Sequence, residues 1–226
     1  MHGIGELVND GSKPMRSIGE SLALLDNDGQ IKYDGDMGKI IAQYSQDTRF
    51  SKYLEIGTWN GGGSTYCFAK GFESRTQPFK FASLEINEQM YTEAKSKYLN
   101  LPYIDLFKAR IIKDEEFPPI NELLEMFESV NTEWLRDDMN NFFKTSYFDV
   151  ESYKPEVVLL DGSEYLTYFE FKKLYNSTKV FILDDINTEK CKKVVEELKN
   201  NHNWREVYFE PSQRNGWAVY ENLNLL

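Results

Sequence analysis

The sequence contains little of what several common kinds of site require. Its 226 residues include only two cysteines and two histidines, too few for a disulfide framework or a histidine-based metal site. Acidic residues outnumber basic ones by 37 to 26, which gives a formal net charge of −11. This balance disfavours nucleic acids and anionic membranes as partners, because both are bound through clusters of lysine and arginine.

Long apolar runs and a secretory leader are also lacking. No apolar stretch reaches the roughly 20 residues that a membrane-spanning helix needs. Residues 1–10 contain neither the basic nor the apolar region of a signal peptide. We therefore expect a cytoplasmic protein in which Cys67 and Cys191 are reduced packing residues within helices.

What is present is a regular alternation of short apolar strands and amphipathic helices. The chain length suits one α/β domain spanning residues 1–226. Such alternation predicts a mainly parallel sheet with helices on both faces. Two segments lie outside the pattern: an N-terminal helical segment, 1–50, and a helical insertion, 114–153. The seven expected strands are 53–56, 79–86, 103–112, 157–160, 180–183 and an antiparallel hairpin of 204–209 and 217–220. Helices are expected over 18–25, 36–46 and 165–175, from residue 64 to a stop at Gly71, after the capping residue Asn87, twice within 114–153, and from Asn187 or Thr188 onward.

Glycines and acidic residues gather where these strands end. Parallel sheets bind ligands beyond the carboxyl ends of their strands, where the winding direction changes. The segment LEIGTWNGGGST, residues 54–65, follows this rule, with Gly57 directly after the first strand. It matches neither G-x-G-x-x-G nor a glycine-rich loop ending in Gly-Lys-Ser/Thr. A dinucleotide site is therefore disfavoured, and a nucleoside-triphosphate site is excluded.

This segment resembles motif I of class I S-adenosylmethionine-dependent methyltransferases. The resemblance implies a Rossmann-like fold and a loop whose backbone cradles the methionine part of the cofactor. It also implies that Glu85, at the end of the second strand, binds the two ribose hydroxyls; a solvated strand end is the alternative. Glu55, inside an apolar strand, would organise the loop or meet the cofactor's ammonium. The cofactor-binding residues implied in this way are Glu55, Gly57, Thr58, Trp59, Gly61, Gly62, Ser64, Glu85 and Asp161.

Three aspartates follow the next two strands. Asp161 comes after residues 157–160, and Asp184 and Asp185 come at the end of the strand 180–183. Neighbouring parallel strands bring these carboxylates together, where they repel and raise one another's pKa unless a cation offsets them. Mg²⁺ is a simple remedy because it prefers oxygen ligands. Helix capping and cofactor contacts without a metal are the alternative.

This arrangement resembles the metal-dependent O-methyltransferases of the class I group. They include catechol, caffeoyl-CoA and antibiotic-sugar methyltransferases. The resemblance implies that Asp161, Asp184 and Asp185 hold Mg²⁺, which lowers the pKa of an acceptor hydroxyl. The acceptor would be a small polar compound, such as a sugar.

The sequence departs from this pattern at the catalytic base. The related enzymes carry lysine three residues, or aspartate two residues, after the first metal aspartate. Here those positions are Glu164 and Ser163. Glu164, together with Asp161, is the candidate catalytic residue; a helix-start carboxylate favoured by the helix dipole is the alternative for Glu164.

Three functions therefore remain open. The first is Mg²⁺-assisted O-methylation, the second is metal-independent N- or O-methylation, and the third is a non-catalytic S-adenosylmethionine-binding module. A homo-oligomer is compatible with each. Segments 1–35 and 114–153 are expected to form a lid or acceptor pocket, because loops at strand ends usually carry specificity.

Overall fold

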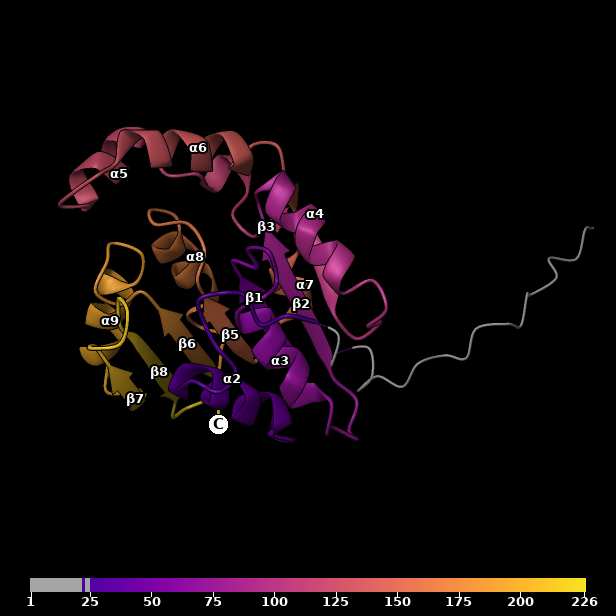
Figure 1. Ribbon diagram of the computed structural model, residues 1–226. Coiled ribbons are helices and arrows are strands. Elements are labelled where there is room, and N and C mark those ends of the chain that lie inside the picture. The colour runs from indigo at the N-terminus through magenta and orange to yellow at the C-terminus, as the bar shows by residue number, and fades with distance from the viewer. Residues whose placement is uncertain (1–21, 23–24) are drawn as a thin grey trace, which may run out of the picture.

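A single mixed sheet organises the chain in the computed structural model, which describes residue 22 and residues 25–226 (Figure 1). Its strand order is β4-β3-β2-β1-β5-β6-β8-β7. Strands β1 to β6 pair in parallel, whereas β8 is antiparallel to both β6 and β7. The strands are β1 (Lys52–Ile56), β2 (Lys80–Glu85), β3 (Asp105–Arg110), β4 (Ser146–Tyr147), β5 (Val157–Leu160), β6 (Val180–Asp184), β7 (Trp204–Glu210) and β8 (Trp217–Asn222).

The predicted parallel sheet and its C-terminal hairpin are confirmed, with one strand more than expected. The additional strand, β4, is two residues long and extends the sheet beyond β3. It lies within the segment predicted as a helical insertion. So short a strand carries no periodic pattern, which explains why the sequence gives no sign of it.

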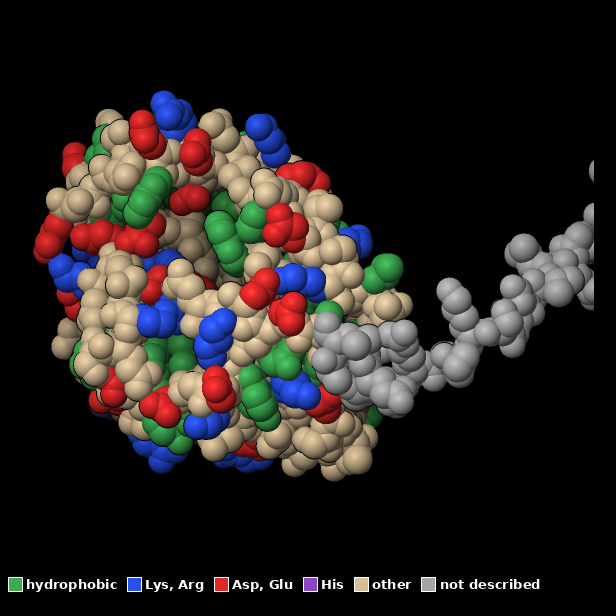
Figure 2. Space-filling view, viewed as in Figure 1, with side chains coloured by type: hydrophobic (Ala, Val, Ile, Leu, Met, Phe, Trp, Pro, Cys, Tyr) green, Lys and Arg blue, Asp and Glu red, His purple; other side chains and the backbone are tan. Residues whose placement is uncertain are grey.

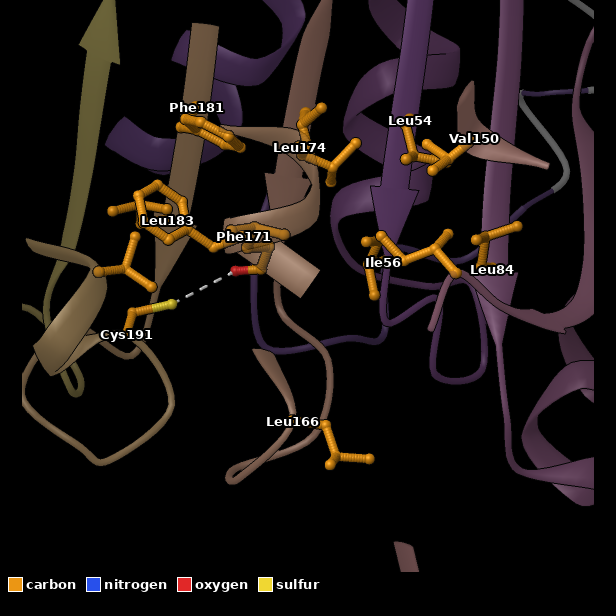
Figure 3. Close-up of a cluster of buried hydrophobic side chains, with 14 of the residues drawn as sticks. Leu54, Ile56, Leu84, Val150, Leu166, Phe171, Leu174, Phe181, Leu183 and Cys191 are labelled. Atoms are coloured by element: carbon orange, nitrogen blue, oxygen red, sulfur yellow. Dashed lines mark hydrogen bonds between the residues drawn. The ribbon is translucent and has the colours of Figure 1, made fainter. Parts of the chain in front are cut away.

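Helices cover both faces of the sheet. On one face lie α2 (Asp36–Gln46), α3 (Ser64–Phe72) and α4 (Glu88–Lys97), and on the other α7 (Val150–Tyr153), α8 (Thr167–Leu174) and α9 (Lys192–Lys199). All four residues of β5 are buried, as expected of a strand covered on both sides. Figure 3 shows the cluster beneath α8, where Phe171 and Leu174 pack with Ile56 of β1 and Phe181 of β6.

Helix boundaries follow the predictions in part. Asn87 caps α4 as expected: its side chain accepts hydrogen bonds from the backbone N–H groups of Gln89 and Met90. Gly71 was expected to end its helix but lies inside α3, where its Cα packs against α2. A Cβ there would come within 2.6 Å of the Ala42 carbonyl oxygen, so the glycine serves helix packing.

Two further expectations need comment. The last helix begins at Lys192, later than the expected 187 or 188, and Cys191 precedes it as a buried N-cap residue. Of the short helix expected over 18–25, all but residues 22 and 25 lie outside the described residues. No helix among the described residues is long and apolar enough to cross a membrane.

The insertion 114–153 contains the two predicted helices, α5 (Ile120–Met126) and α6 (Thr132–Phe142), after a 3₁₀ turn at Asp114–Glu116. Figure 1 shows α5 and α6 crossing above the carboxyl ends of the strands. A small apolar cluster, Leu123, Phe127, Leu135 and Tyr165, joins them to the loop after β5. The insertion therefore covers the edge at which a ligand is expected.

Candidate functional site

The site begins where the chain changes its winding direction, between β1 and β5. Strands β2 and β3 lie on one side of β1, and β5 and β6 lie on the other. Gly57 follows β1 with φ of +96°, and a Cβ there would lie 2.0 Å from the carbonyl oxygen of Asp161. Only glycine permits so close an approach of the two strand ends. The gap that opens above them is the usual place for a ligand in such sheets.

Two adjoining cavities occupy this place, and Figure 2 shows the surface hollowed beneath α5 and α6. The loop cavity, about 370 Å³, lies between residues 28–31, the glycine-rich loop and the ends of β5 and β6. The helix cavity, about 170 Å³, lies between the end of β2, the loop after β5 and α6. Both are lined by Gly57, Trp59, Asp161 and Gly162, so a single ligand can extend from one into the other.

Glu85 is a buried, anchored carboxylate in the wall of the helix cavity. Its Oε2 accepts a hydrogen bond from the backbone N–H of Trp59 at 2.7 Å, and its Oε1 accepts one from Asn87 at 2.8 Å. Burial raises its pKa to about 7, although these backbone donors act in the opposite direction. Glu85 is thus no solvated strand end, and each oxygen retains a lone pair for a ligand.

The predicted loop residues divide into two groups. Thr58, Trp59 and Ser64 line the loop cavity together with Gly57. Trp59 adopts φ of +52°, and the residue is 63% exposed. Gly63, which was not among the predicted site residues, also lines this cavity.

Gly61 and Gly62 serve packing in the structure. A Cβ on Gly61 would come within 2.8 Å of the Tyr98 ring, and the Tyr98 hydroxyl donates a hydrogen bond to the Gly61 carbonyl at 2.6 Å. Gly62 packs against Asp28, and its carbonyl accepts a hydrogen bond from the Gly29 N–H at 2.9 Å. These glycines bring α4 and the N-terminal segment against the loop.

Glu55 supports the loop from below. It is fully buried, and its Oε2 accepts hydrogen bonds from the hydroxyls of Thr65, at 2.7 Å, and Ser83, at 2.5 Å. The Thr58 hydroxyl shares a further short hydrogen bond with Ser83. Of the two predicted roles for Glu55, the structure thus supports organising the loop.

Two more acidic side chains line the helix cavity, and the sequence did not single them out. Asp138 of α6 accepts a hydrogen bond from the Ser163 hydroxyl at 2.5 Å. Glu170 of α8 is buried, and its Oε2 has no hydrogen-bond partner among the described residues. Burial raises the pKa of Asp138, and burial with the charges of Asp138 and Glu85 raises the pKa of Glu170 to about 8.

The three aspartates predicted as metal ligands do lie together. One oxygen from each of Asp161, Asp184 and Asp185 lies within 4.8 Å of the other two. Two cationic side chains lie among them. Lys190 donates to Asp161 Oδ1 and to Asp185 Oδ2, both at 2.7 Å. Arg214 donates to Asp184 Oδ2, also at 2.7 Å.

Burial and these ion pairs shift the pKa values of the three aspartates in different directions. Burial raises the pKa of Asp161 to about 7 against the effect of Lys190, and burial with the charge of Asp185 raises the pKa of Asp184. Burial acts to raise the pKa of Asp185 as well, but Lys190, Asn215 and Arg214 together hold it below its ordinary value. The cluster therefore combines negative and positive groups in one wall.

The candidate base Glu164 lies in the turn between β5 and α8 and is partly exposed. It is not among the described residues that line the loop or helix cavity. Asp161, by contrast, lines both. Ser163, which stands at the other position where related enzymes carry the base, donates a hydrogen bond to Asp138 of α6.

Sequence reasoning missed Lys190 and left Arg214 without a role. Lys190 stands five residues after Asp185 in a turn, and Arg214 stands in the hairpin between β7 and β8. A lysine close behind an acidic pair was an available signal. No spacing rule, however, joins Arg214 to an aspartate 30 residues earlier.

Comparison with known proteins supports the fold. No protein-family model and no curated protein matches the sequence. An O-methyltransferase of Bacillus cereus in complex with S-adenosylhomocysteine (SAH) is 15% identical, with a TM-score of 0.54 over 96% of this chain and 93% of its own.

Two further solved structures show the same likeness. An SAH-bound methyltransferase of Podospora anserina is 11% identical over 91% and 87% of the two chains, with a TM-score of 0.52. The O-methyltransferase TomG of Streptomyces achromogenes, involved in tomaymycin synthesis and in complex with S-adenosylmethionine (SAM), is 11% identical over 82% and 79%, with a TM-score of 0.51. The chain therefore has the class I methyltransferase fold that its sequence predicts.

Proposed function

We propose that this chain transfers the methyl group of SAM to an oxygen of a small polar acceptor. The observation that carries the proposal is the pair of cavities that join at Asp161, above the change in winding direction. SAM is an elongated molecule with an adenosyl part and a methionyl part. Structural neighbours with SAM or SAH bound share the fold.

The helix cavity suits the adenosyl part. Glu85 offers two carboxylate oxygens, held in place by backbone donors, to the two ribose hydroxyls. Apolar groups of Ile86, Ala109, Phe142 and Leu166 complete the wall against which a flat base can pack.

The loop cavity suits the methionyl part and the acceptor. Thr58 and Ser64 of the glycine-rich loop line it, as do the cationic residues Lys190 and Arg214. Methyl transfer requires the acceptor oxygen, the methyl carbon and the sulfur to lie in line. The oxygen loses its proton and bonds to the methyl carbon, while the carbon–sulfur bond breaks and SAH forms.

Asp161 is placed to take part in this step. It lines both cavities, and its pKa of about 7 lies close to neutral pH, where a carboxylate can accept a proton. Glu164 remains a candidate base by its sequence position, but it would have to turn toward the cavity. Asp161 is therefore the better candidate.

The three aspartates are of the right type to bind the Mg²⁺ implied by the resemblance, but they are already paired with cationic side chains. Three carboxylate oxygens within 4.8 Å of one another suit a hard divalent ion. Each aspartate, however, already accepts a hydrogen bond from Lys190 or Arg214 at 2.7 Å. An ion would have to compete with these two cationic side chains for the same carboxylates, so this observation favours the metal-independent alternative and we route no step through a metal.

Methyl transfer tests the proposal directly. The protein is incubated with SAM carrying an isotopically labelled methyl group and with a panel of catechols, sugars and small hydroxy acids, in parallel with EDTA and with Mg²⁺. Labelled product that forms equally in both arms supports metal-independent transfer, and product with Mg²⁺ alone supports the metal-assisted form. SAH binding with no transfer to any acceptor would instead favour a non-catalytic binding module.

A further inference from the structure

The ammonium group of Lys190 lies between two carboxylates of the aspartate cluster. It is shared between Asp161 and Asp185, and only 12% of the lysine side chain is exposed. A protonated lysine has three N–H donors, and two of them are taken by these carboxylates. The third remains for a ligand in the loop cavity, which Lys190 lines.

The position of Lys190 is fixed by its neighbours along the chain. The Thr188 hydroxyl accepts a hydrogen bond from the backbone N–H of Lys190 at 3.3 Å. The backbone N–H of Thr188 donates to the Asp185 carbonyl at 3.2 Å. Cys191, the next residue, is fully buried, and its thiol contacts the Leu160 carbonyl at 3.9 Å. These contacts hold the turn that carries Lys190 in place, and the ammonium therefore lies beside the carboxylates.

Charge balance points the same way. The three aspartates carry at most three negative charges, when all are ionised, and Lys190 and Arg214 offset two of them. Arg214 is itself held, since it also donates to the Gln30 side chain at 3.1 Å and approaches Asp185 at 3.8 Å. At most one negative charge therefore remains, which matches a singly charged sulfonium better than a divalent ion.

We propose that Lys190 takes the place of a metal ion in this site. Its ammonium binds the carboxylates of Asp161 and Asp185 and directs its third N–H at the acceptor oxygen, so that the acceptor site is complete without a divalent cation. This inference rests on the proposed function for the identity of the ligand. The occupancy of the aspartate cluster can be tested without any methyl transfer.

Binding of Mn²⁺, followed by the loss of its free-ion electron paramagnetic resonance signal, tests the proposal on SAH-saturated protein. We expect the unsubstituted protein to show no Mn²⁺ site that Asp185→Asn removes. Lys190→Met removes the ammonium at similar length and leaves the carboxylates without it, so its Mn²⁺ affinity should rise at least tenfold. Lys192→Met is the matched control, because Lys192 pairs with exposed Glu128 outside the site.

The outcomes separate cleanly. A site on the unsubstituted protein that Asp185→Asn abolishes would overturn the proposal, and this result does not depend on whether Lys190→Met folds. A folded Lys190→Met variant with no more Mn²⁺ binding than Lys192→Met would overturn it as well. Failure of SAH to bind at all would instead count against the proposed function.

Discussion

The two cavities use the same residue type in opposite ways. Asp161 and Asp185 line the loop cavity, the buried Asp184 lies beside them, and Lys190 and Arg214 match these three aspartates at hydrogen-bond distance. Apart from the shared Asp161, the acidic residues of the helix cavity are Glu85, Asp138 and Glu170. These three have no ion-pair partner among the described residues, and their pKa values are raised mainly by burial.

This difference indicates which part of a ligand each cavity can hold. Unpaired buried carboxyl groups suit neutral donors such as ribose hydroxyls and an adenine amino group, which satisfy them without adding charge. Paired charges suit the ionic methionyl part and an acceptor oxygen that becomes negative during transfer. The division between the cavities therefore follows the chemistry of SAM itself.

The substitution Gly57→Ala should have the largest effect, because Gly57 lines both cavities. The new Cβ would lie 2.0 Å from the Asp161 carbonyl oxygen, at φ of +96°. We expect the free energy of unfolding, measured in urea, to fall by about 3 kcal/mol or more, with loss of SAH binding. Gly35→Ala is the control, because Gly35 has φ of −76° and ψ of 165° at a helix start; a loss beyond about 1 kcal/mol there would undermine this reading.

Glu170→Gln should change how the stability of the protein depends on pH. It tests whether the helix cavity holds an unpaired carboxyl group, in contrast to the loop cavity. The folded protein holds the Glu170 proton up to about pH 8, whereas the unfolded chain releases it near pH 4.5. Between these values the folded state binds more protons, so this group makes stability decrease as the pH rises. In the ligand-free protein, Glu170→Gln should flatten that slope and add on the order of 2 kcal/mol at about pH 6.

Glu125→Gln supplies the control for that prediction, because Glu125 is exposed on α5. Its slope should match that of the unsubstituted protein. If Glu170→Gln shows the same slope as Glu125→Gln, then Glu170 is not an unpaired carboxyl group in the folded state. The contrast between the two cavities would then lose one of its three acidic members.

Ser163→Ala should have the smallest effect and should be confined to the cover of the helix cavity. It removes the hydrogen bond that the Ser163 hydroxyl donates to Asp138 of α6. We expect a loss of about 1 kcal/mol in unfolding free energy and faster amide hydrogen exchange in α6. Ser152→Ala breaks a Ser–Asp hydrogen bond of 2.7 Å on the exposed surface; an equal loss there would show that burial adds nothing at Ser163.

Much of this fold could be predicted from the sequence, because its signals are local. The helix at 36–46 has apolar residues at regular spacing, Asn87 is a capping residue, and Gly57 ends an apolar strand. The gathering of Asp161, Asp184 and Asp185 followed from the rule that neighbouring parallel strands end at one edge.

What the sequence could not supply depends on contacts between distant segments. Arg214 reaches Asp184 from a hairpin turn, and Asp138 reaches Ser163 from the insertion. Loop glycines also look alike in sequence, although Gly57 and Gly63 line the loop cavity while Gly61 packs beneath Tyr98. Lys190 was passed over because the sequence pattern offered Mg²⁺ as a simple cation for three aspartates.

A calorimetric titration of SAH tests the central claim, that the two cavities together hold this cofactor. It is made on the unsubstituted protein, on Glu85→Ala and on Glu88→Ala, which alters an exposed carboxylate paired with Lys108. We predict one site per chain, an affinity lowered tenfold or more by Glu85→Ala, and no change for Glu88→Ala. Absence of binding to the unsubstituted protein, or equal binding by a folded Glu85→Ala variant, would contradict the account.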